Sequence, residues 1–242
     1  MNIIKIDSTT STNLYLKELI QEKKLEEKTL VITETQTAGR GQAGSSWESE
    51  SGKNITCSLV LYPTFLSVKQ NFLLSEIIAL SIKQTLDEYL DSVQIKWPND
   101  IYFKDKKIAG VLIENEIQGK YLTQSIVGIG LNVNQETFSS NIPNPVSLKQ
   151  ILGLKIDKDN LLQVLLDKID YWYNQLKSGD VKEITQTYHD ALYRRSGFYS
   201  YRDKNGNLEA EIISVQPDGQ LLLRTSNGEE RAYYFKEVVY NR

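Results

Sequence analysis

The pattern near the C-terminal end of this 242-residue chain constrains its fold most strongly. From about residue 197 onward the sequence runs in short alternating stretches, interrupted by three dipeptides that are typical of β-hairpin turns. They are Asn205-Gly206, Asp218-Gly219 and Asn227-Gly228. A segment of roughly 45 residues is close to the lower size limit for folding alone. We therefore expect two domains, over residues 1–195 and 196–242, with the small all-β domain packed on the larger one.

The first 195 residues mix helical and strand periodicity, which predicts an α/β body. We expect helices over residues 11–20, 68–90, 157–177 and 180–193. We expect strands over residues 28–35, 54–62, 93–97, 101–103, 108–114 and 125–133. The charged turn at 104–107 separates two of these strands and predicts a hairpin.

Composition excludes several classes of protein. The net charge of −3 gives no support to nucleic-acid binding, which usually needs a basic face. The N-terminus lacks a basic and apolar leader, and no apolar stretch approaches the roughly 20 residues that span a bilayer, so we expect a cytoplasmic protein without membrane attachment. A single cysteine, Cys57, rules out an internal disulfide and fits a buried small hydrophobe. The lone His189 has no companion for a His and Cys metal site.

Four short segments carry groups suited to binding anions and a purine. Two glycines bracket Arg40 in GRGQAGSSW, where bare backbone N–H groups and a guanidinium match phosphate or carboxylate. KWPND ends a strand and places Asn99 and Asp100 on a tight turn. In KKIAGVLIEN, Lys107 enters an apolar strand, where a point charge stabilises developing negative charge better than in water. In GIGLNVN, Asn132 offers both a donor and an acceptor to a purine edge.

Together with an N-terminal STN, these segments resemble the ordered motif set of biotin protein ligases. The matching segments are Ser11–Asn13, Gln36–Trp47, Lys96–Asp100, Lys106–Glu114 and Gly128–Asn134. The resemblance implies an α+β fold: a mixed or antiparallel sheet with helices, like the class II synthetase-type catalytic domain of biotin and lipoate ligases, plus a small C-terminal barrel of the Src-homology-3 type. It also implies an enzyme that converts biotin and ATP to biotinoyl-5′-adenylate. Biotin then passes to a lysine of a biotin carboxyl carrier domain, the implied protein partner.

The resemblance also implies roles for individual residues. Lys107 and Arg40 would be catalytic, and Asp100 would lie beside the phosphates and Mg²⁺. The biotin site would comprise Ser11, Thr12, Asn13, Gln36, Gly39, Arg40, Gly41, Gln42, Trp47, Lys107, Gly110 and Gly128. The ATP site would comprise Arg40, Gln42, Asn99, Asp100, Lys107 and Asn132. Trp47 and Trp97 are also interpreted as packing anchors.

Two features of this chain differ from those of some biotin protein ligases. Family loops commonly read Gly-Arg-Gly-Arg, whereas the second arginine position here is Gln42, which lowers the positive charge available to an adenylate. The STN motif begins at residue 11, so we expect a ligase without the DNA-binding domain found in some relatives. The alternatives are a lipoate or octanoate ligase or transferase of the same fold, and a non-catalytic biotin sensor. The sequence leaves open whether the protein is a monomer or a homodimer.

Overall fold

The computed structural model describes residues 1–140 and 142–241. The larger sheet contains β1 (Asn2–Thr9), β2 (Thr29–Gln36), β5 (Ile55–Leu61), β6 (Val93–Lys96), β7 (Asp100–Phe103), β8 (Lys106–Gln118) and β9 (Tyr121–Leu131). A second sheet contains β10 (Tyr199–Asp203), β11 (Gly206–Val215), β12 (Leu221–Thr225), β13 (Glu230–Tyr233) and β14 (Val239–Tyr240). A two-stranded ribbon pairs β3 (Gly39–Arg40) with β4 (Ser46–Trp47). The helices are α1 (Thr12–Glu22), α2 (Phe72–Leu86), α3 (Leu148–Leu152), α4 (Lys158–Ser178) and α5 (Val181–Asp190).

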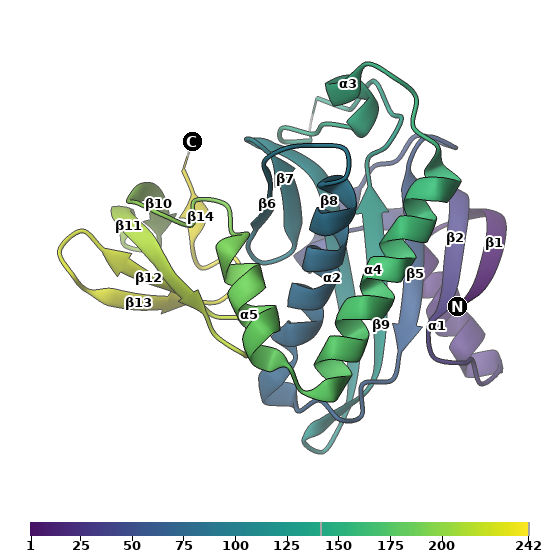
Figure 1. The fold of residues 1–242 in the computed structure, drawn as a ribbon, viewed down its shortest axis with the longest axis horizontal. Helices are drawn as coiled ribbons and strands as arrows, with labels where there is room; N and C mark the ends of the chain where they lie inside the picture. The colour runs from purple at the N-terminus through teal and green to yellow at the C-terminus, as the bar shows by residue number, and fades with distance from the viewer. Residues whose placement is uncertain (141, 242) are drawn as a thin grey trace.

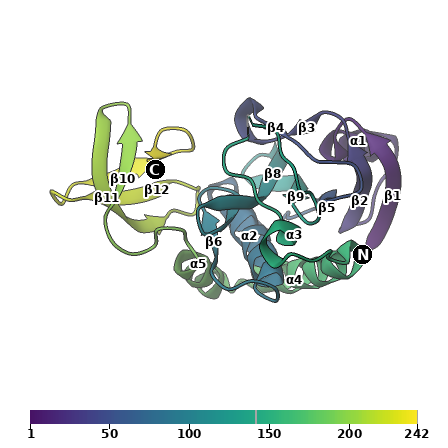
Figure 2. The same cartoon turned by 90° about the horizontal axis from the view of Figure 1, so that it is seen from above.

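The two sheets give the protein a mixed α+β architecture with a separate all-β part, which confirms the expected fold class (Figure 1). The larger sheet has the order β1-β2-β5-β9-β8-β7-β6 and is antiparallel except for the parallel β1–β2 pair. The second sheet is antiparallel, with the order β13-β12-β11-β10-β14. Seen from above, this second sheet lies to one side of the larger one (Figure 2).

Helices cover both faces of the larger sheet because its central strands are apolar on both sides. On β2 and β5, Leu30 and Leu59 belong to the main core, which also contains the buried faces of α2, α4 and α5. The next residue of each strand, Val31 or Val60, points the other way and packs in a smaller cluster with Leu16 of α1. Figure 2 shows α1 on the side of the sheet opposite α4.

Local signals placed several boundaries correctly. Asp157 caps α4 by accepting the backbone N–H groups of Asp159 and Asn160, and α4 ends at Gly179, whose φ of 88° is the left-handed value that glycine adopts freely. The three dipeptides in the tail each fall at a hairpin of the second sheet. No helix in the described ranges is both long enough and apolar enough to cross a bilayer.

Four expectations about the elements were wrong or incomplete. The helix expected over 68–90 is a short 3-10 turn, Val68–Gln70, followed by α2, which ends at Leu86. The turn expected over 104–107 occupies only two residues, so Lys106 and Lys107 already belong to β8. The hairpin of β8 and β9 reaches Gly119, further than either expected strand. β1 and α3 were not predicted, because β1 is a largely exposed edge strand and α3 has only five residues.

The second sheet contacts the body through a tight turn between β11 and β12. The indole Nε1 of Trp97 donates a hydrogen bond to the carbonyl oxygen of Gly219 over 2.9 Å. Gly219 has a φ of 93°, and a Cβ there would lie 2.8 Å from the ring of Phe72 on α2. This turn therefore needs glycine, and it rests on the strand end that carries Asn99 and Asp100. The contact confirms the interpretation of Trp97 as a packing anchor.

Candidate active site

A cavity of about 340 Å³ brings residues of all five sequence segments together. The predicted residues that line it are Ser11, Thr12, Asn13, Gln36, Arg40, Gly41, Gln42, Trp47, Asn99, Asp100, Lys107, Gly110 and Gly128. Gly39 and Asn132 are predicted site residues that do not line it. Gly39 lies directly behind the wall, since a Cβ there would come within 2.5 Å of Gln36 Nε2.

The first turn of α1 forms one polar end of the cavity. Gln36 Oε1 accepts the backbone N–H of Thr12 over 2.9 Å. Ser58 Oγ on β5 lies 2.7 Å from Thr12 Oγ1 and 2.6 Å from Asn13 Oδ1. Ser11 occupies the N-cap position of α1, yet its side chain makes no capping hydrogen bond. This cluster of buried donors and acceptors suits a small polar ring rather than an alkyl chain.

The glycine-rich loop supplies three buried polar atoms that have no partner within the described residues. They are Arg40 Nε, Gln42 Oε1 and Trp47 Nε1. Another nitrogen of the same Arg40 guanidinium is fixed, because Nη2 donates to Glu114 Oε2 over 2.7 Å. Asn13 Nδ2 also donates to that carboxylate oxygen over 2.7 Å. Buried polar groups without partners are costly, about 1–3 kcal/mol each, so these atoms point to a ligand.

Lys107 lines the same cavity, next to Trp47 of this loop. Its Nζ is 2.6 Å from Asp100 Oδ1 and 5.6 Å from the centre of the Trp47 ring. The side chains of Lys107 and Asp100 are about one quarter exposed, at 25% and 23%. Trp47 in turn lies against bare backbone, because a Cβ on Gly130 would come within 2.2 Å of its ring. Trp47 therefore packs as an anchor and also lines the cavity.

The two asparagines of the expected ATP site already use their amide donors on the backbone. Asn99 Nδ2 donates to the carbonyl oxygen of Val111 over 2.6 Å. Asn132 Nδ2 donates to the carbonyl oxygen of Val146 over 3.1 Å, while its buried Oδ1 has no partner among the described residues. Asn99 faces the cavity, whereas Asn132 is 3% exposed and lies outside the lining.

The local charge of the cavity is opposite to that of the chain. Four basic side chains line it within the described ranges, namely Arg40, Lys96, Lys107 and Lys236, against the single carboxylate of Asp100. The formal charge of the whole chain is −3. A concave, basic wall concentrates field lines and attracts anions.

Sequence reasoning missed several residues of this site. Ser58 is a polar residue within the largely apolar strand ITCSLVL, and this is a signal that could have identified it. Glu114 begins the polar run Glu114–Glu116, so its sequence context gives no such signal. Phe235, Lys236 and Val238–Tyr240 also line the cavity, although they come from the last residues of the second sheet. Nothing local in their sequence indicates this, because their position depends on how the second sheet docks.

Cys57 and His189 fit structural roles. Burial raises the pKa of the Cys57 thiol to about 12, so it stays protonated and unreactive near neutral pH. His189 lies on α5, and burial lowers its pKa below the ordinary value, which favours the neutral ring.

Comparison with known proteins identifies the class of protein that this fold and cavity define. Residues 5–132 match the model of the biotin/lipoate A/B protein ligase family. The match spans more than half of the chain, and it includes STN, the glycine-rich loop and KWPND. The chain belongs to this family.

Individual relatives narrow the comparison. The chain is 29% identical over 238 residues to the bifunctional ligase/repressor BirA of Bacillus subtilis, covering 96% of this chain and 72% of that protein. It is 30% identical to the biotin--[acetyl-CoA-carboxylase] ligase of Paracoccus denitrificans, covering 83% of this chain and 85% of that one. A structure of the biotin protein ligase from Aquifex aeolicus in complex with biotin and ATP superposes with a TM-score of 0.82 at 26% identity, covering 100% and 99% of the two chains.

Proposed function

We propose that this protein is an ATP-dependent biotin protein ligase. It activates biotin to biotinoyl-5′-adenylate and then transfers biotin to a lysine of a biotin carboxyl carrier domain. The observation that carries the proposal is the cavity itself, where Arg40, Gln42 and Trp47, whose buried polar atoms have no partner among the described residues, line the same basic cavity as Lys107. The similarity to ligases named for biotin, over nearly the whole chain, supports the same substrate.

Each end of the cavity suits one part of the biotin molecule. The hydroxyl and amide groups of Thr12, Asn13 and Gln36 would hydrogen-bond the fused ureido ring, with Ser11 beside them. Gly128 leaves room for this cluster, since a Cβ there would lie 2.4 Å from Asn13 Oδ1. The glycine-rich loop would cover the bound ring, and the carboxylate would extend toward Lys107.

The first step joins two anions, so it needs positive charge and positioning rather than a covalent nucleophile. A carboxylate oxygen of biotin attacks the α-phosphorus of ATP, the bond to the bridging oxygen breaks, and pyrophosphate leaves. Lys107 would bridge the carboxylate and the α-phosphate, releasing Asp100 as it does so.

In the second step the lysine amine of the carrier domain attacks the acyl carbon and AMP leaves. The nitrogen loses a proton as the amide forms. Arg40 would hold the phosphate of the adenylate during this step through its unpartnered Nε, while Glu114 keeps the guanidinium in place. Asn99 would lie beside the adenine, with Asn132 behind it.

The residues of the cavity fit an Mg²⁺ ion that binds together with the nucleotide rather than one held by the protein alone. No cluster of three His, Cys, Asp or Glu residues that could hold a metal occurs in the described part of the chain. Mg²⁺ is commonly bound by one or two carboxylates together with substrate phosphates. Asp100 is the carboxylate on the cavity wall, and it would serve once Lys107 has moved to the phosphates. When bound, Mg²⁺ neutralises phosphate charge.

One experiment tests the proposal directly. The purified protein is incubated with ATP, Mg²⁺, an acceptor carrier domain and either biotin or lipoate. The mass of the acceptor is then measured by mass spectrometry. We expect a mass increase of one biotin, with one AMP and one pyrophosphate released per modified lysine. A lipoyl mass instead would indicate the related ligase, and binding of biotin without any AMP would indicate a sensor.

A further inference from the structure

Gln135 is a buried polar residue just after the GIGLNVN segment, and the proposed mechanism does not use it. Its side chain is 1% exposed and makes four hydrogen-bond contacts. Its Oε1 accepts from the backbone N–H of Glu50 over 3.0 Å and from Asn54 Nδ2 over 2.6 Å. Its Nε2 donates to the carbonyl oxygen of Thr137 over 2.8 Å and to Glu48 Oε1 over 3.4 Å.

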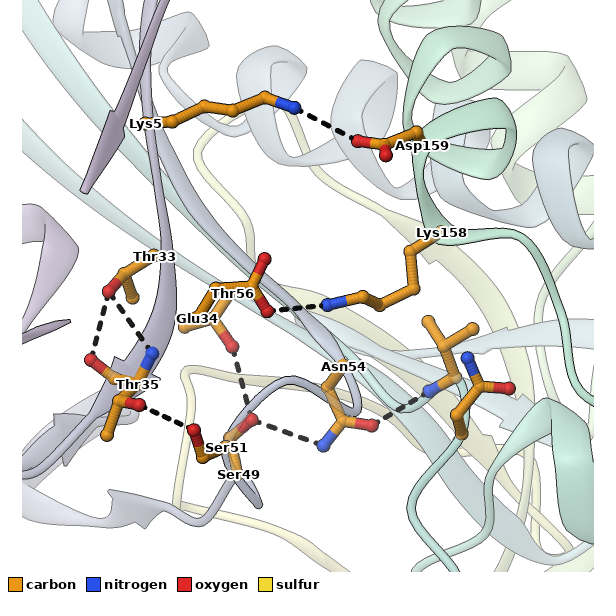
Figure 3. A network of polar contacts seen from close by, with 12 residues as sticks. Lys5, Thr33, Glu34, Thr35, Ser49, Ser51, Asn54, Thr56, Lys158 and Asp159 are labelled. Carbon is orange, nitrogen blue, oxygen red and sulfur yellow. Dashed lines mark hydrogen bonds and ion pairs between the residues drawn. The ribbon is translucent and has the colours of Figure 1, made fainter. Parts of the chain in front are cut away.

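We call the glycine-rich loop, residues 39–53, the clamp loop. Two of these partners, Glu48 and Glu50, lie at the end of the clamp loop, and a third, Asn54, follows it directly. Figure 3 shows how this end is fastened: Ser49 contacts Asn54 and Thr56, and Ser51 contacts Thr35 of β2. These contacts hold the loop to neighbouring strands. A second set of contacts connects the loop to residues 133–139: Val133 N–H donates to Asn54 Oδ1, Asn134 N–H to the carbonyl oxygen of Lys53, and Ser139 N–H to Glu48 Oε1. Gln135 belongs to this set, and its one side chain contacts Glu48, Glu50 and Asn54 together.

The other end of this connection reaches Lys107 in two steps. The main-chain carbonyl of Gln135 accepts a hydrogen bond from Ser147 Oγ over 2.6 Å. The preceding residue, Val146, donates its N–H to the carbonyl oxygen of Lys107 over 2.9 Å, and Lys107 donates its own N–H to the carbonyl oxygen of Asn144 over 2.8 Å. We call residues 144–147 the return segment. This segment is hydrogen-bonded to the backbone of Lys107 through Asn144 and Val146, and to the backbone of Gln135 through Ser147.

We propose that Gln135 is a positioning residue that fixes the position of the clamp loop relative to Lys107. This inference rests on the proposed function, because it assumes that the clamp loop holds biotin and that Lys107 meets the α-phosphate. A nucleotide that fixes Lys107 then also steadies the base of the clamp loop through the return segment and Gln135. Binding of either substrate favours binding of the other, and the coupling is reciprocal.

The test measures biotin affinity by calorimetry with and without a non-hydrolysable ATP analogue and Mg²⁺. We expect the analogue to tighten biotin binding by about fivefold or more in the native protein, the low end of typical coupling. The variant Gln135→Met keeps the length of the buried side chain but removes its hydrogen bonds. We expect its linkage to fall below about twofold, with each ligand still bound on its own.

A matched control separates this role from general loosening of the loop. Gln150 closes a capping box on Ser147 and also holds the carbonyl oxygen of Glu136, yet it makes no hydrogen bond to the clamp loop. Gln150→Met is therefore expected to keep the native linkage. Equal loss in both variants, or native linkage in Gln135→Met, would overturn the proposal.

A second measurement needs no variant. Adding the ATP analogue alone should slow hydrogen exchange at the Glu50 amide, which donates to Gln135, and unchanged exchange there would refute the connection even if Gln135→Met failed to fold. Independent binding of both ligands to the native protein would overturn this inference and leave the proposed function intact. Failure to bind either ligand would overturn both.

Discussion

Glu76 makes the stability of this protein depend on pH in an unusual direction. It lies on α2, is 1% exposed, and has one hydrogen bond, from Thr185 Oγ1 on α5 over 3.3 Å. Burial raises its pKa from 4.5 to about 8, and the Thr185 hydrogen bond opposes that shift only in part. The neighbouring Tyr188 is also buried, and its hydroxyl has no partner within the described residues.

The folded state holds the Glu76 proton more tightly than the unfolded chain does. The contribution of this group is therefore fully present below pH 4.5 and is lost as the pH rises toward about 8. The slope in that window is about 1.4 kcal/mol per pH unit, which gives a loss of about 2–3 kcal/mol between roughly pH 5 and 7. Most buried or paired carboxylates with lowered pKa values act in the opposite direction.

Glu76→Gln replaces the carboxyl with a neutral group of the same shape that can still accept from Thr185. We expect the free energy of unfolding of the variant, relative to native, to rise by about 2–3 kcal/mol from roughly pH 5 to 7. Urea denaturation at several pH values measures this difference. The control is Glu18→Gln on α1, where the side chain is exposed. Parallel pH profiles for native and Glu76→Gln would refute the reasoning.

Three further predictions concern the proposed reaction. Lys107→Ala should keep the fold, checked by circular dichroism, and slow adenylate formation by about 100-fold or more, as loss of one preorganised charge contact does; near-normal synthesis would contradict its assignment. Hydrogen exchange over residues 39–53 should slow when biotin is added, since the loop covers the bound ligand and gains contacts with it; equal protection would count against a clamp. Gln42→Arg should slow release of biotinoyl adenylate by about tenfold or more through a charge-assisted contact, measured with the acceptor omitted; equal or faster release would exclude residue 42 as the retention point.

The sequence predicted those parts of the site that depend on short-range chemistry. The Gly39–Trp47 loop and the KWPND strand end carry their chemistry in consecutive residues, and the structure places both on the cavity. The helix over 157–177 was also predicted well, because a capping aspartate and a left-handed glycine mark its two ends. Patterns of this kind need no knowledge of the tertiary structure.

Other parts depend on contacts between distant segments and could not be predicted in this way. Glu114 binds the guanidinium of Arg40, although the two residues are 74 positions apart in the sequence. Residues 235–240 reach the cavity only because the turn at Gly219 docks on Trp97 and Phe72. Asn132 matches a family motif, yet its side chain supports Val146 rather than lining the cavity.

The charge of the cavity also depends on contacts between distant segments. This charge explains how a protein with a negative net charge can bind two anions. Net charge describes the average over the whole chain, and a value of −3 says nothing about the charge of one cavity. Folding brings Lys96 from the large sheet and Lys236 from the region of the second sheet to the same wall as Arg40 and Lys107. Because Asp100 is the only carboxylate among the described lining residues, its contact with Lys107 leaves a cationic excess in the cavity. The part of that excess that Lys236 supplies is present only while the second sheet is docked. We therefore expect the affinity of the cavity for ATP to depend in part on a contact far from the glycine-rich loop.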